Sequence, residues 1–402
     1  MSTVGLADVQ AARALLQDVV RTTPLEGCRP LAGLVGGPVS LKCENLQRTG
    51  SFKLRGAYVR IARLSDEERA RGVVAASAGN HAQGVALAAG LLGTHATVFM
   101  PQAAPLPKVE ATRGYGAEVR AAGSTVDEAL VVAQQHADET GAVLIHPFDH
   151  PDVVAGQGTV GLEVLEQCPQ VKTIVVCTGG GGLVAGIAVA VKALRPDVRV
   201  VAAQARAAAA FPGSLLAGRP TALTTMTTMA DGIAVGRPGE LTFALVRDLV
   251  DDVVTVDEDT LSRALLLCLE RAKLVVEPAG AAAVAAVLDD PGAFEPPVVA
   301  VVSGGNVDPL LLSKVIRHGL LAAGRFLSLH VRIPDRPGEL ARMLAVPAAT
   351  GANVLEVEHR RTGRGLHLDE VEVWVQLETR GPDHSEAVGK ALAGTGYTAV
   401  PG

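Results

Sequence analysis

The sequence contains few aromatic residues, few cysteines and no long apolar run. Aromatic residues make up 3% of the 402 residues, so alanine, valine and leucine must fill most of the core. The five cysteines lie far apart and form no Cys-x-x-Cys pair, which argues against a disulfide framework and a zinc knuckle. Every apolar run is interrupted by charge, glycine or proline before it could cross a bilayer, so no membrane partner is expected.

Charge is also low and nearly balanced. Lysine and arginine number 36, aspartate and glutamate number 42, and the net charge is -6. The basic residues are dispersed, which is unlike the basic patch of a nucleic-acid binder, so small molecules are the expected partners. Residues 1–10 have neither the basic nor the apolar part of a secretory signal, which predicts a cytoplasmic protein.

Short β-branched runs alternate with longer alanine-rich stretches from about Leu41 to Leu321. This alternation is typical of a parallel sheet covered by helices on both faces, so the predicted fold class is α/β. The expected strands are 73–76, 96–100, 117–121, 143–146, 173–177, 199–204, 253–256 and 298–302. The expected helices include 84–90, 183–194 and 261–274.

After the eighth expected strand the pattern changes. Apolar and polar residues alternate in two segments, which predicts half-buried strands over 327–333 and 371–377. A Pro/Gly turn at 335–338 opens a helix, a further strand covers 353–359, and a second helix lies near 385–393. With a last strand at the C-terminus, this order of elements is that of a ferredoxin-like module.

One lysine lies where its chemistry could be unusual. In Ser51-Phe52-Lys53-Leu54-Arg55-Gly56-Ala57, Lys53 occupies the predicted first turn of a helix that Ser51 caps. The helix dipole at this end and burial beside Phe52 and Leu54 both disfavour an ammonium, so both lower the pKa of the amine. A lowered pKa favours nucleophilic chemistry, whereas the alternative is an ordinary solvated lysine.

Four consecutive glycines, Gly179 to Gly182, separate an expected strand from an expected helix. Bare backbone amides at a helix start bind phosphate in many folds, so we expect a phosphorylated ligand here rather than a merely flexible turn. A dinucleotide is disfavoured because the next expected strand ends in Gln204 rather than in an acidic residue. No Gly-Lys-Ser/Thr triplet indicates a P-loop. An imine-forming lysine together with a glycine turn favours pyridoxal phosphate.

Two further strand ends carry polar side chains. Ser77, Asn80 and His81 follow the first expected strand, where a helix start would offer amide donors to a carboxylate. Ser303 follows the eighth expected strand, at the end where open α/β sheets bind ligands. Taken singly, Asn80 is as easily a helix cap, His81 a surface group and Ser303 a turn residue.

Taken together, these motifs resemble those of the fold-type II pyridoxal-phosphate enzymes, most closely the threonine dehydratases (threonine ammonia-lyases). The matching motifs are Thr23-Pro24-Leu25, Lys42-Cys43-Glu44-Asn45-Leu46-Gln47, 51–57, 77–84, the glycines, Ala230-Asp231-Gly232, Glu277-Pro278-Ala279-Gly280 and Ser303-Gly304-Gly305-Asn306. The resemblance implies a tryptophan synthase β-like catalytic region of two α/β subdomains that converts L-threonine to 2-oxobutanoate and ammonia. A catabolic L-serine/L-threonine dehydratase is the alternative.

By this resemblance the cofactor is pyridoxal 5'-phosphate. Lys53 would hold it covalently and later act as the general base, Asn80 would bind its phenolic oxygen, and Ser303 would meet its ring nitrogen. A neutral hydroxyl at that nitrogen leaves the ring a weaker electron sink, which suits β-elimination better than transamination. The residues implied to bind the cofactor are Lys53, Phe52, Asn80, Gly179, Gly180, Gly181, Gly182, Leu183 and Ser303. Those implied to bind the substrate are Ser77, Gly79, Asn80 and His81, with Glu277 as a further pocket candidate or a structural carboxylate.

Two positions depart from relatives within this resemblance. Serine racemases of similar sequence have a second serine where this chain has Ala78, so racemisation is not expected. Relatives that bind a divalent ion have acidic residues just after the strand that corresponds to 199–204. This chain has Gln204, Arg206 and a run of alanines, so no metal is expected.

Residues 325–402 resemble the ACT domain, a small regulatory fold that binds amino acids between paired copies. The motif is Asp335-Arg336-Pro337-Gly338-Glu339-Leu340 followed by Gly351-Ala352-Asn353-Val354, and it implies Gly338 and Asn353 as effector residues. A glycine turn at a helix start offers amides to an effector carboxylate. A purely structural dimerisation unit is one alternative, and a catalytically silent amino-acid sensor is another.

We therefore expect a catalytic domain over 1–320, a linker near 318–324 and a regulatory domain over 325–402. By resemblance, the chain would form a homo-oligomer, either a dimer or a tetramer. Isoleucine inhibition with relief by valine, as suits isoleucine biosynthesis, is the first effector to test.

Overall fold

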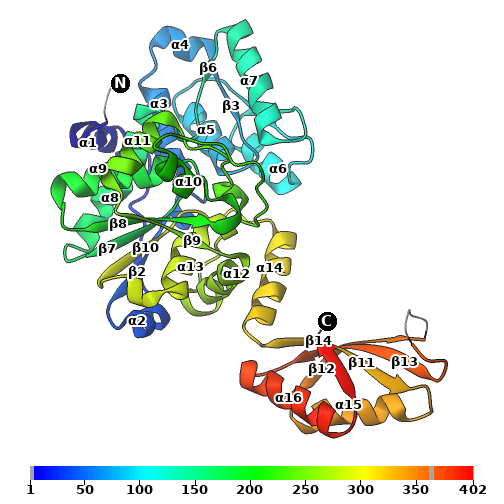
Figure 1. The fold of residues 1–402 in the computed structure, drawn as a ribbon. Helices are drawn as coiled ribbons and strands as arrows, with labels where there is room; N and C mark the ends of the chain where they lie inside the picture. The colour runs from blue at the N-terminus through cyan, green and yellow to red at the C-terminus, as the bar shows by residue number, and fades with distance from the viewer. Residues whose placement is uncertain (1–3, 362–365, 402) are drawn as a thin grey trace. The chain divides into compact units, whose positions relative to one another are not determined.

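The computed structural model describes residues 4–361 and 366–401, and the chain divides into two compact units, Met1–Leu312 and Ser313–Gly402 (Figure 1). The first unit contains a six-stranded and a four-stranded sheet, and the second unit contains another four-stranded sheet. Among the described residues, no helix has both the length and the apolar character needed to span a bilayer.

The larger sheet of the first unit has the strand order β1-β2-β10-β7-β8-β9. Its strands are β1 (Leu25–Gly27), β2 (Val39–Cys43), β7 (Thr173–Cys177), β8 (Arg199–Ala205), β9 (Asp252–Val256) and β10 (Val298–Val302). Only β1 runs antiparallel to its neighbour, and the other pairs are parallel. The central strands β7 and β10 are buried along their whole length because helices cover both faces.

Helices α8 (Pro151–Gln167) and α9 (Gly182–Leu194) pack against each other, and their apolar side chains share one core with β7 and β8. On the opposite face, α13 (Ala282–Asp289) contacts β10, β7, β8 and β9 (Figure 1). The other helices around this sheet are α1 (Leu6–Leu15), α2 (Arg29–Val35), α10 (Ala210–Ala217), α11 (Glu240–Leu249) and α12 (Glu258–Leu267).

The smaller sheet of the first unit is parallel, with the order β5-β4-β3-β6. Its strands are β3 (Val73–Ala76), β4 (Ala96–Met100), β5 (Glu118–Ala121) and β6 (Val143–Leu144). The associated helices are α3 (Lys53–Ala62), α4 (Asp66–Arg71), α5 (Asn80–Leu91), α6 (Leu106–Gly114) and α7 (Val126–Thr140). Because α3 packs on both α5 and α8, it connects the cores of the two sheets, and Lys53 is its first residue.

The second unit has an antiparallel sheet in the order β12-β13-β11-β14. Its elements are β11 (Phe326–Pro334), α15 (Glu339–Ala349), β12 (Asn353–Arg360), β13 (Glu370–Glu378), α16 (Pro382–Gly394) and β14 (Thr398–Pro401). Met343 of α15 and Val388 of α16 share one core with the sheet. This is the ferredoxin-like order that the sequence predicts. The predicted linker begins inside helix α14 (Pro309–Ala322).

The structure also corrects parts of the prediction. Strands β1 and β2 and helix α8 were not expected, and the strand expected over 143–146 ends at Leu144. The helix expected over 261–274 ends at Leu267 and continues as a π-helical turn, Cys268–Ala272.

Candidate active site

Lys53 begins helix α3, and Phe52 rather than Ser51 occupies the capping position. The prediction that Ser51 caps this helix is wrong, because Ser51 forms a bridge with Gly304 and its buried hydroxyl has no hydrogen-bond partner among the described residues. The Lys53 amine donates a hydrogen bond to the carbonyl of Pro147 at 2.9 Å and lies 5.1 Å from the centre of the Phe52 ring. Helix α3 therefore begins with an amine directed at the loop that precedes α8.

Burial lowers the pKa of the Lys53 amine from its ordinary 10.5 to about 8, and the nearby Glu277 carboxylate opposes this only in part. Some of the side-chain surface stays accessible, but protein atoms surround the amine. Burial likewise raises the pKa of Glu277 to about 7. Since the neutral amine is the nucleophilic form, a pKa near 8 favours covalent chemistry at Lys53 near neutral pH.

The glycine turn joins β7 to α9, which begins at Gly182. Gly181 has a φ of 95°, a left-handed conformation that favours glycine. A Cβ atom on Gly180 would lie 2.5 Å from the Phe148 ring, and one on Gly182 would lie 2.9 Å from the Phe148 Cβ. The turn therefore has no room for side chains, while the helix start leaves backbone amides that can bind a phosphate.

Asn80, Glu277 and the loop after β10 meet in one place. The Asn80 amide nitrogen donates to Glu277 Oε1, and Asn80 Oδ1 accepts a hydrogen bond from Asn306 at 2.8 Å. The Ser303 carbonyl accepts from the Phe52 amide at 3.3 Å, and the Ser303 side chain lies next to Cys177 at the end of β7. These contacts bring residues predicted from four separate motifs to the start of helix α3.

The turn between β3 and α5 contains Ser77, Gly79 and His81. The Gly79 amide donates to the Ser77 hydroxyl at 3.1 Å, and α5 begins at Asn80. The His81 ring bonds to the carbonyl of Ile145 at 2.8 Å, and burial lowers its pKa to about 3, so the ring is neutral. His81 can therefore offer the site its backbone amide rather than a charged imidazole.

Sequence reasoning missed three contributors to this region. Pro147 and Phe148 lie in the loop before α8, where one supplies the carbonyl for Lys53 and the other fills the space below the glycine turn. Lys108 of α6 pairs with Asp231 at 2.9 Å, and its amine would lie 3.8 Å from a Cβ atom on Gly79. Of these three residues, only Phe148 could have been noticed in the sequence, because aromatic residues make up 3% of the chain.

A buried ion network lies along α3 beyond Lys53. Arg55 bonds to both oxygens of Glu44 at 2.8 Å and to Glu163 of α8 at 2.7 Å. Glu163 also pairs with Lys42 of β2 at 2.5 Å. The Arg55, Lys42 and Glu44 side chains are fully buried, so this network of two cations and two carboxylates fixes α3 against α8 and β2.

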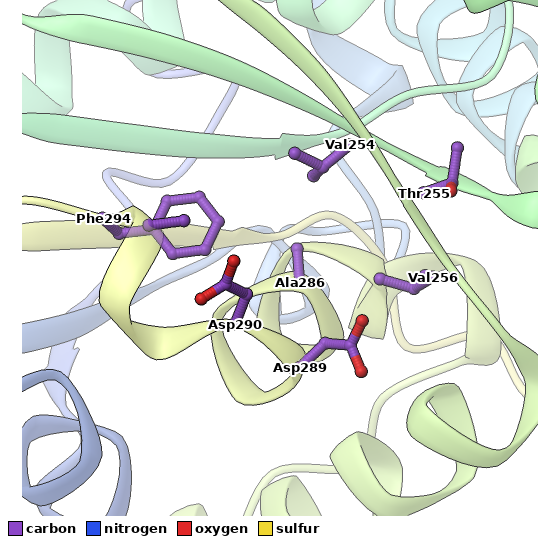
Figure 2. Close-up of a pocket in the computed structure, with 8 residues that line it drawn as sticks. Val254, Thr255, Val256, Ala286, Asp289, Asp290 and Phe294 are labelled. Atoms are coloured by element: carbon purple, nitrogen blue, oxygen red, sulfur yellow. The ribbon is translucent and has the colours of Figure 1, made fainter.

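A cavity of about 260 Å³ lies at the edge strand β9 and contains none of the predicted site residues. Figure 2 shows the Phe294 ring and the Asp289 and Asp290 carboxylates beside β9 residues, with no lysine or glycine turn among the lining side chains. Among the described residues, the chemistry-bearing side chains gather around Lys53 and not in this cavity.

The two predicted effector residues lie at different ends of the second unit. Gly338 has a φ of 87° and precedes α15, after the last residue of β11. Asn353 is the first residue of β12 and lies opposite Glu378 of β13. Glu378 in turn lies opposite Phe326, the first residue of β11. The fold therefore does not bring these two residues together within one chain.

The Lys53 amine, the glycine turn, Asn80 and Ser303 all lie in the first compact unit. Residues 16–304 match the family model described as pyridoxal-phosphate dependent enzyme, and the chain belongs to this family.

Within that family the chain is similar to the L-threonine ammonia-lyase of Thermotoga maritima, with 46% identity over 394 residues, which are 98% of each chain. It is 44% identical over 322 residues to the catabolic L-threonine dehydratase TdcB of Staphylococcus aureus, covering 79% of this chain and 93% of that one. The solved structure of maize serine racemase matches with a TM-score of 0.75 and 39% identity, over 80% of this chain and 99% of that one.

Proposed function

We propose that the chain is an L-threonine ammonia-lyase, which converts L-threonine to 2-oxobutanoate and ammonia with pyridoxal 5'-phosphate as its cofactor. The observation that carries this proposal is the buried Lys53 amine at the start of α3, in the same site as Asn80, Ser303 and the glycine turn. The similarity to the Thermotoga enzyme covers 98% of the chain and so includes both compact units.

The residues of the site fit this cofactor. Positions 179–183 offer amides to a phosphate, and glycines leave no Cβ atoms in a turn where Phe148 leaves no room for them. The Asn80 amide suits the phenolic oxygen, the Ser303 hydroxyl suits the ring nitrogen, and Phe52 lies beside the Lys53 amine. When bound, pyridoxal phosphate stabilises the negative charge that develops on the substrate α-carbon.

The residues around Lys53 bind the substrate, and Lys53 itself transfers the proton. The Ser77 hydroxyl and the amides of the turn from Gly79 to His81 hold the substrate carboxylate, which orients the α-hydrogen towards Lys53. Lys53 Nζ in its neutral form takes that proton as general base. The Cβ–O bond breaks as the Cα–Cβ double bond forms, and the β-hydroxyl takes up a proton and leaves as water. Hydrolysis of the released enamine then gives the 2-oxo acid and ammonia.

An assay of 2-oxo acid release from L-threonine and L-serine tests this proposal. We expect threonine to be the faster substrate. A catabolic L-serine/L-threonine dehydratase is the alternative, and comparable turnover of the two amino acids would favour it. Absence of any 2-oxo acid from either substrate, with pyridoxal phosphate present, would contradict both.

Racemisation is the competing reaction because maize serine racemase is a structural relative. The turn between β3 and α5 has Ala78 beside Ser77, so it offers no second hydroxyl to return a proton to the opposite face. We expect L-serine to give pyruvate without D-serine, which chiral chromatography of the reaction mixture can check.

The pKa of Lys53 predicts how the apoprotein takes up its cofactor. Only the neutral amine attacks the cofactor aldehyde, so the rate of covalent attachment should rise with pH and level off above about pH 8. Stopped-flow absorbance after mixing apoprotein with pyridoxal phosphate measures this rate. A rate that continues to rise to pH 10 would mean that the site does not lower the pKa of Lys53.

We further propose that residues 1–320 form the catalytic domain and that residues 325–402 form an ACT regulatory domain. The ferredoxin-like order of the second unit supports this assignment. The placement of Gly338 and Asn353 at different ends of the sheet fits an effector site shared between copies in a homo-oligomer. The alignment with the catabolic relative covers 79% of this chain. The remaining fifth is close to the size of the second unit, Ser313–Gly402.

Regulation of this kind suits isoleucine biosynthesis, with isoleucine as inhibitor and valine as its antagonist. Five free, buried cysteines fit a reducing cytoplasm. Equilibrium dialysis of the whole enzyme with isoleucine and valine tests the effector, and analytical ultracentrifugation tests the oligomer. If neither isoleucine nor valine binds, the effector proposal is wrong, while the proposed lyase activity is unaffected.

A further inference from the structure

The side chain of Asn306 joins two loops of the site. Its amide nitrogen donates to the Thr49 carbonyl at 2.7 Å and to Asn80 Oδ1 at 2.8 Å. A backbone carbonyl can only accept a hydrogen bond, so the group of Asn306 that faces Thr49 must be its NH₂ group. The orientation of the Asn306 amide is thereby fixed by a partner whose role cannot be reversed.

Asn306 in turn fixes the orientation of the Asn80 amide. Because the NH₂ group of Asn306 donates towards Asn80, the atom of Asn80 that faces it must be the carbonyl oxygen. The NH₂ group of Asn80 then points the other way, where one N–H donates to Glu277 Oε1. A reversed Asn80 would set NH₂ against NH₂ at Asn306 and a carbonyl oxygen against the Glu277 carboxylate.

The backbone before α3 is shaped around Asn306. Gly50 has a φ of 70°, and a Cβ atom there would collide with Asn306 Oδ1. The Gly305 amide donates to the Gly50 carbonyl at 2.9 Å, which holds the two loops together. Asn306 therefore occupies a defined position and is not a loosely placed turn residue.

We propose that Asn306 is a positioning residue that fixes the amide of Asn80, so that Asn80 presents an N–H donor to the phenolic oxygen of the bound cofactor. This inference rests on the proposed function, which places pyridoxal phosphate at Lys53. Asn80 has two N–H groups, and with one committed to Glu277 the other is left for the cofactor.

Three variants at these positions test the proposal in the full-length protein. Asn306→Ala should weaken pyridoxal phosphate binding by about tenfold and shift the visible absorbance of the bound cofactor. Asn306→Asp has nearly the same shape but cannot donate when ionised, so it should have the larger effect. A role in packing alone would give the opposite order. In an Asn80→Ala background, Asn306→Ala should add no further spectral shift.

Asn45→Ala is the matched control. Asn45 is also buried and donates to a backbone carbonyl, that of Val275 at 3.1 Å, but no described hydrogen bond joins its side chain to Asn80 or Asn306. It should lower the unfolding temperature while leaving the dissociation constant and the absorbance of the cofactor unchanged. If Asn306→Asp does not fold, Asn306→Ala and the double variant decide the question.

Suppose that the wild-type enzyme releases 2-oxo acid. The inference is then overturned if both Asn306 variants keep the wild-type affinity for the cofactor and its absorbance, or if Asn45→Ala changes these two quantities as much as the Asn306 variants do. A wild-type protein that neither binds pyridoxal phosphate nor deaminates threonine would instead overturn the proposed function, and the inference with it.

Discussion

Lys53→Ala is expected to give a folded protein that forms no covalent link to pyridoxal phosphate and releases no measurable 2-oxo acid from threonine. The alanine methyl group can neither attack the cofactor aldehyde nor accept the substrate α-proton. General-base catalysis alone contributes up to about 10⁴-fold in rate, and the loss of covalent attachment adds to this. Visible absorbance of the bound cofactor and a 2-oxo acid assay measure the two losses separately.

Lys108→Ala is the control for this change, because Lys108 is also a lysine near the substrate turn and pairs with Asp231. It should keep the covalent link. Reduction of the wild-type holoenzyme with borohydride, followed by peptide mapping, should find the cofactor on Lys53. Recovery of the label on Lys108, or near-normal turnover by Lys53→Ala, would contradict the assignment of Lys53.

The reactive lysine was predictable from the sequence, but the way its helix begins was not. A serine two residues before Lys53 is an ordinary helix-cap signal. In the structure, Ser51 instead pairs with Gly304, far away in the sequence, and Phe52 takes the capping position. Short-range propensity cannot anticipate a tertiary contact of that kind.

The same contrast holds for the secondary structure. The strands 73–76, 96–100, 173–177 and 298–302 were predicted with the bounds of β3, β4, β7 and β10, since fully buried strands read as continuous apolar runs. Helix α8 was missed because its sequence contains three glycines, which usually disfavour a helix. A Cβ atom on Gly156 would lie 2.7 Å from the Arg55 carbonyl, and one on Gly158 would lie 2.7 Å from the Gly186 carbonyl. These glycines let α8 pack closely on α3 and α9.

The ion network could not be predicted either. Lys42, Glu44, Arg55 and Glu163 come from three separate segments, and charged residues are seldom fully buried. Only the folded chain shows that each charge has an opposite partner. Burial opposes ionisation of Glu44, yet the attraction of Arg55 prevails and keeps the pKa of Glu44 below its ordinary value.

Among the single replacements proposed for this protein, Glu163→Gln is expected to lower the free energy of unfolding the most, by about 3–5 kcal/mol. Glu163 bonds to both Arg55 and Lys42, whose side chains are fully buried, so its neutral replacement leaves an uncompensated positive charge. Urea unfolding monitored by the absorbance of the bound cofactor reports on the first unit and measures the change.

Glu166→Gln, on the same helix, is the matched control. Glu166 pairs with Arg13, but 54% of its side chain is exposed, so its replacement should cost about 0.5 kcal/mol or less. Equal losses for the two glutamates would mean that water reaches the buried network and screens its charges. The structure gives no such access, because the Arg55 and Lys42 side chains have no exposed surface.

A second replacement separates the charge of Glu163 from its packing. Lys42→Met in the Glu163→Gln background removes the unpaired ammonium and leaves Arg55 with Glu44, so the double variant should be more stable than Glu163→Gln alone. If the double variant is instead the less stable protein, the cost of Glu163→Gln arises from lost packing. Recovery of stability would mean that the buried charges are retained as a set, each needed because the others are present. That would explain why the helix that begins with Lys53 is held by ions in an interior otherwise packed with alanine and valine.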